Sequence, residues 1–156
     1  MMFNEARGRD DVEAASDLHL EIRVLIEVLN QPGFPPCIAA RHASTLRTAW
    51  EHGQMERLTP IEQDLGNQLQ RLDRELEYID GQPATRRTLI ETGEVQCHME
   101  QVRFLRYLVI AALKATQDPT LADGYFRQAR VLYETNRRRQ CQSCRSGHES
   151  VALPAL

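Results

Sequence analysis

Residues 104–113 read Phe-Leu-Arg-Tyr-Leu-Val-Ile-Ala-Ala-Leu, which is the most apolar stretch of the chain. Arg106 is the only charged residue in it. A helix needs about 20 apolar residues to cross a lipid bilayer, so this run is too short to span one. We therefore predict that it forms the middle of a helix that other helices surround.

The apolar residues on either side of this run continue with helical spacing, and they predict a long central helix from about Thr85 to Thr116. Its main stripe consists of Val95, Met99, Val102, Leu105, Val109, Leu113 and Thr116. Gly93 interrupts the pattern, because glycine weakens a helix interior. A short helix followed by a long one from Glu94 is therefore an alternative.

Four further segments carry helical spacing of apolar residues, and no segment shows the alternation of a strand. Their predicted ranges are 10–29, 35–52, 59–79 and 119–139. Thr59 and Asp118 each precede a proline, which marks them as N-terminal caps. Gly53 is predicted to end the second helix. The sequence thus predicts an all-α fold, an antiparallel bundle of about five helices.

The length of 156 residues suits one domain. We predict a helical bundle domain over residues 1–140. Residues 141–156 have a loop composition and form a short irregular tail that contains cysteines, either flexible or tied to the bundle by a metal ion.

The first helix has a clear apolar stripe, formed by Ala15, Leu18, Ile22, Leu25 and Leu29. Leu20, Val24 and Val28 widen it, which predicts that this helix is well buried. The first and third helices both have near-heptad spacing, which also suits the seam of a homodimer. Burial of both stripes in the core of one chain is the favoured interpretation.

The most specific motif is Cys141-x-x-Cys144-x-x-x-His148, whose thiolates and imidazole have the spacing of ligands for one Zn²⁺ ion. A closed structural zinc site takes four ligands. Cys97 and His98 on the central helix are candidates for the fourth, and a second subunit is another source. The alternative is a polar tail whose cysteines are incidental, because half of a zinc motif is a weak signal.

The end of the chain is rich in arginine: Arg127, Arg130, Arg137, Arg138, Arg139 and Arg145. Such a patch can contact phosphates. Salt bridges on a solvated helix face are the favoured interpretation. His42 falls on the apolar side of the second helix, near Leu46 and Trp50, and is predicted to be a hydrogen-bonded core histidine.

No paired Glu-x-x-His motif, glycine-rich phosphate loop or nucleophile elbow occurs, so the sequence favours a protein without catalytic activity. We predict a small helical-bundle protein that acts through protein–protein interaction, as an adaptor, regulator or inhibitor. The alternative is a zinc-binding regulator or sensor, with one structural zinc ion as its cofactor. The net charge of −3 argues against nucleic acid or a membrane as the partner. The lack of a signal peptide predicts a cytoplasmic location.

Overall fold

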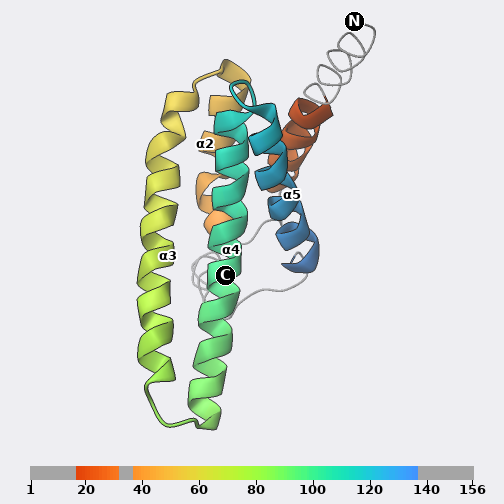
Figure 1. Cartoon of the computed structure of the whole chain (residues 1–156). Helices are drawn as coiled ribbons and strands as arrows, with labels where there is room; N and C mark the ends of the chain where they lie inside the picture. Colours follow the sequence, from red (N-terminus) through yellow and green to blue (C-terminus); the bar gives the residue numbers. More distant parts are fainter. Residues whose placement is uncertain (1–16, 32–36, 137–156) are drawn as a thin grey trace, which may run out of the picture.

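A computed structural model describes residues 17–31 and 37–136 of the chain. These residues form five α-helices and no strand (Figure 1). The helices span residues 17–29, Cys37–His52 (α2), Thr59–Asp80 (α3), Arg86–Lys114 (α4) and Pro119–Asn136 (α5), with a short 3₁₀ helix at Met55–Arg57 (η1). The prediction of an all-α bundle is confirmed.

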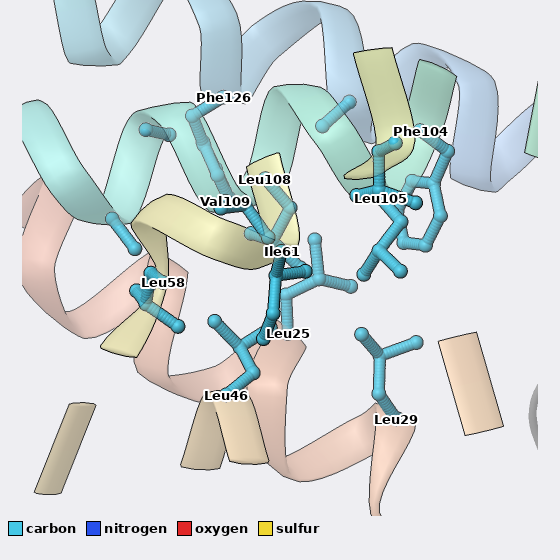
Figure 2. Packing of buried hydrophobic residues seen from close by; sticks show 14 of the residues in the cluster. Leu25, Leu29, Leu46, Leu58, Ile61, Phe104, Leu105, Leu108, Val109 and Phe126 are labelled. Carbon is cyan, nitrogen blue, oxygen red and sulfur yellow. The ribbon is translucent and has the colours of Figure 1, made fainter. Parts of the chain in front are cut away.

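Helix α4 is the centre of the bundle, as the apolar run predicted. It packs mainly against α3 and α5, and also against α2. Figure 2 shows Leu108 and Val109 of α4 between Ile61 of α3 and Phe126 of α5. Leu25 and Leu46, from the first helix and α2, complete this part of the core. The second half of α4 is therefore covered on several sides, whereas an ordinary surface helix buries one stripe.

Helix α4 begins at the predicted place. Thr85 adopts an extended backbone, and its side chain accepts a hydrogen bond from the backbone N–H of Thr88 at 3.2 Å. The Thr88 hydroxyl in turn accepts from the backbone N–H of Thr85 at 2.7 Å. This reciprocal capping box satisfies two backbone N–H groups that a helix start leaves without partners. The alternative break at Gly93 is wrong, because α4 runs without interruption through it.

Two more predicted helix ends are confirmed. Asp118 caps α5, since its Oδ1 accepts from the backbone N–H of Leu121 at 3.2 Å. Gly53 ends α2 in the left-handed region, with φ of 66°. The N–H of Gln54 then reaches back to the carbonyl of Ala49 at 2.9 Å. That bond is the one expected of a Schellman motif.

The predicted capping role of Thr59 is wrong. The N-cap of α3 is Leu58, and no side chain caps this helix start. The preceding residues already form η1, and Leu58 itself has helical backbone angles. Leu58 is fully buried in the core. Burial of this leucine therefore fixes where α3 begins, in place of a side-chain hydrogen bond.

The first helix is only partly as predicted. Leu18, Ile22, Leu25 and Leu29 are buried in the core of this one chain, as favoured over a dimer seam. Leu20 and Val24, however, are 59% and 55% exposed, so the prediction that they widen the buried stripe is wrong. Both project from the side of the helix opposite the buried row.

The stripe of α3 also packs within the chain, with Ile61, Leu65, Leu69 and Ile79 buried. Within residues 17–31 and 37–136, every helix is too short or too polar to cross a lipid bilayer. The predicted tail of residues 141–156 lies outside the described residues, so its separation from the bundle stays a prediction.

Candidate functional site

The predicted zinc ligands fall in two parts of the chain. Cys141, Cys144 and His148 lie outside the described residues. Cys97 and His98 lie on α4, where successive side chains project about 100° apart, so they do not converge on one ion. Among the described residues, no three His, Cys, Asp or Glu side chains are grouped to hold a metal ion.

Of the two candidates for a fourth ligand, His98 has the freer ligating atom. Its Nδ1 is buried and accepts or donates no hydrogen bond within the described part of the chain. The Sγ of Cys97 is instead 4.0 Å from the Nε2 of Gln101, which donates to it. The zinc site stays a prediction. Zinc analysis of the full chain and of the variants Cys144→Ser and His98→Ala tests it, because loss of either true ligand lowers the bound zinc.

The described part of the arginine-rich end is engaged in ion pairs, as the sequence favoured. The Nε of Arg127 lies 2.9 Å from Asp123, and this hydrogen bond raises the pKa of the guanidinium. Arg130 contacts Glu134 at 3.3 Å and Glu21 of the first helix at 3.8 Å. The other predicted arginines, Arg137, Arg138, Arg139 and Arg145, lie outside the described residues.

His42 lies half-buried on α2, and burial lowers the pKa of its imidazole. Its Nε2 is buried and has no hydrogen-bond partner in the described residues. The prediction that His42 is a core histidine with a hydrogen bond is therefore wrong about the hydrogen bond, because its buried Nε2 makes none with a described residue. The neutral imidazole is the form that such a position favours, because the desolvation of the charged form outweighs its attraction to the Asp64 carboxylate.

Two hollows on the surface of the described residues have an arginine in their lining, and a further one of about 710 Å³ lies along α4 and α5, where Asp118, Leu121 and Tyr125 are among its lining residues. The first, of about 460 Å³, lies between α3 and α4. There the Nε of Arg106 donates to Oε1 of Glu62 at 3.0 Å. Gly66 lies beneath the guanidinium, which would be only 3.3 Å from a Cβ at that position. This hollow is polar, with charges of both signs in its lining, and two of them, Arg106 and Glu62, form an ion pair within the protein.

The second hollow, of about 530 Å³, lies where the first helix meets the end of α2, and we call it the Trp50 hollow. Its lining is His19, Leu20, Arg23, Trp50, Gly53, Met55 and Thr116. The rings of His19 and Trp50 are in contact, with centroids 5.3 Å apart and planes tilted by 36°. Trp50 and Met55 are partly buried against the core. The exposed Leu20 thus stands beside the only tryptophan of the chain.

Local structure explains how these side chains come together. The Schellman turn at Gly53 reverses the chain directly after α2, and η1 then places Met55 next to Trp50. At the other end of the first helix, the Asn30 amide donates to the carbonyls of Ile26 and Ala43 at 2.8 and 3.0 Å. The bond to Ala43 links the end of the first helix to α2.

The charged side chain in the lining of the Trp50 hollow is positive. Arg23 forms no ion pair with any described residue. Three acidic residues of the first helix and α2 are paired elsewhere, whereas Asp17 and Glu56, which are close in sequence to lining residues, are not themselves part of the lining. Glu27 and Glu51 both contact Arg47, at 3.1 and 3.2 Å, and Glu21 contacts Arg130. The lining therefore contains a cation and an imidazole but no carboxylate.

Sequence reasoning placed Trp50 on the apolar side of α2 and missed the hollow. The signal in the sequence was Leu20, which lies off the main stripe of the first helix and lines the hollow. Comparison with known proteins finds no matching family model, no similar curated protein and no similar solved structure. A functional proposal therefore has to come from the residues themselves.

Proposed function

We propose that this protein works by binding another protein, as an adaptor, regulator or inhibitor, and that the Trp50 hollow is the binding surface. The observation that carries the proposal is the exposure of apolar side chains in a concave site. Leu20 is 59% exposed in a hollow that Trp50 and Met55 also line, and Val24, one turn further along the first helix and outside this lining, is 55% exposed.

Such a surface is suited to binding for two physical reasons. Removing apolar side chains from water is favourable by roughly 25 cal/mol for each Å² buried. Tryptophan is also enriched among the few residues that dominate interface energies, because a large ring in a hollow loses all its water on binding. Here His19 already holds the Trp50 ring in place, so little side-chain freedom is lost when a partner binds.

The α3–α4 hollow is the weaker candidate for this role. Arg103 and Arg106 both line it, together with the carboxylates of Glu62 and Asp73, and Arg106 is already bound to Glu62. A partner would have to break or share that ion pair, which offsets what it gains. The Trp50 hollow contains no comparable internal pair.

Site-specific photo-cross-linking tests the proposal. A photoreactive amino acid replaces Leu20 in the full chain, expressed in the cells that make the protein. The control carries the same group in place of Arg71, an exposed residue of α3 outside both hollows. We expect a discrete adduct with another protein from position 20 and none from position 71. Equal labelling at both positions, or none at position 20, contradicts the proposal.

A further inference from the structure

We propose that the partner segment which occupies the Trp50 hollow is acidic, with an aliphatic or aromatic side chain next to a carboxylate. This inference rests on the proposed function and adds the chemistry of the partner. The apolar side chain would enter between Leu20 and Trp50, and the carboxylate would pair with Arg23.

The charge of the hollow complements an acidic partner. The chain as a whole is acidic, with a net charge of −3 and 22 Asp and Glu residues. A hollow whose lining has a cation and no carboxylate is thus a local exception. Complementary charges steer a partner to its site and exclude partners of the same charge.

Arg23 has no ion pair with a described residue, whereas neighbouring arginines do. The other arginines near the first helix are committed, since Arg47 binds Glu27 and Glu51, and Arg130 binds Glu21 and Glu134. Arg23 is exposed at the edge of the hollow without an ion pair to a described residue. An arginine can hold a carboxylate through two parallel N–H donors, which fixes the orientation of the bound segment.

The exposed apolar side chain of the hollow lies close to its cation. Leu20 and Arg23 are three residues apart on one helix, so they are neighbours on its surface. A bound segment that places an apolar side chain against Leu20 therefore presents its adjacent residue to Arg23. A site that has Leu20 next to Arg23 therefore selects segments with both an apolar side chain and a carboxylate, whereas a purely apolar hollow would accept any hydrophobic segment.

Selection from a phage-displayed library of random linear peptides tests the inference on the full chain. The baits are the natural chain, the charge-reversal variant Arg23→Glu and the matched control Arg71→Glu. Both positions are exposed, so both variants should fold, which circular dichroism verifies. We expect the natural chain and Arg71→Glu to enrich peptides with Asp or Glu beside an apolar residue. Arg23→Glu should enrich Lys or Arg there instead, and should bind the acidic peptides about tenfold more weakly.

Trp50 supplies an independent readout, because it is the only tryptophan in the chain. A selected acidic peptide synthesised without tryptophan should change the Trp50 emission on binding. Three outcomes overturn the inference. The first is that Arg23→Glu selects peptides of the same composition as the natural chain, the second is that no peptide is selected, and the third is that a peptide binds without changing the Trp50 emission. Self-association of the natural chain that Arg23→Glu abolishes also overturns it, since the occupant is then a second copy.

The two proposals can fail separately. If position 20 cross-links to a protein but the selected peptides do not depend on Arg23, the proposed protein–protein interaction stands and the proposal of an acidic partner is wrong. No cross-link from position 20 removes the proposed function itself, whatever the peptides show.

Discussion

Two apolar regions of this molecule have similar residues and opposite surroundings. In the run 104–113 of α4, Leu105, Leu108 and Val109 are completely buried by neighbouring helices. On the first helix, Leu20 and Val24 are more than half exposed. The same side-chain chemistry therefore stabilises the fold in one region and is available for binding in the other. What separates the two is whether another helix covers them.

The largest expected effect tests this contrast directly. Leu105→Ala removes a fully buried side chain and leaves a cavity, so we expect a loss of about 2–5 kcal/mol in the free energy of unfolding. Leu20→Ala should change that free energy by no more than about 0.5 kcal/mol and should weaken the binding of a partner. Urea denaturation measures both. A comparable loss in the two variants would show that Leu20 belongs to the core.

Gly→Ala substitutions at two positions give the next largest change in the free energy of unfolding. They test backbone conformation alone, because the added methyl group is not buried at either position. Gly53 at the Trp50 hollow has φ of 66°, and Gly93 on α4 is helical; an added Cβ would meet no atom within 4 Å at either position. Gly53→Ala should destabilise the protein by about 1–2 kcal/mol, because L-residues are strained in the left-handed region. Gly93→Ala should stabilise it by about 0.5–1 kcal/mol. Thermal unfolding of the two variants should therefore shift in opposite directions.

A smaller effect concerns Arg106, the one charge in the apolar run. Its ion pair with Glu62 is partly open to water, with the side chains 36% and 24% exposed. We expect a coupling free energy of about 0.2–1 kcal/mol from a double-mutant cycle of Arg106→Met and Glu62→Gln. The coupling should decrease at high salt. Zero coupling would mean that only the aliphatic part of Arg106 supports the bundle.

The smallest expected effect is a pH dependence from His42. Burial places the pKa of its imidazole in the folded protein below the usual 6.5. The unfolded chain then binds the proton more readily than the folded protein does. The contribution of neutral His42 to the free energy of unfolding is therefore fully present above pH 6.5, and it is lost as the pH falls through the lowered pKa. Denaturation at about pH 8 and about pH 5 should show a smaller difference in His42→Gln than in the natural chain. An unchanged difference would assign the pH dependence to other groups.

Much of the fold followed from the sequence, and the failures have identifiable causes. The spacing of Val95, Val102 and Leu105 predicted α4, because a buried stripe must recur at the helical period. Thr59 failed as a cap because the burial of Leu58 and the turn of η1 set the start of α3 first. Of the metal candidates, the structure describes only Cys97 and His98, and it shows that their side chains diverge.

The sequence by itself determined that the chain folds into helices, roughly where they begin and end, and which residues form the core stripes. These features depend on local capping and on a period of 3.6 residues, which neighbouring residues specify. Only the tertiary structure decided that Leu20 stays exposed, that His19 contacts Trp50 and that Arg23 has no ion pair with a described residue. Those facts depend on how helices distant in the sequence cross one another, and no local pattern contains that information.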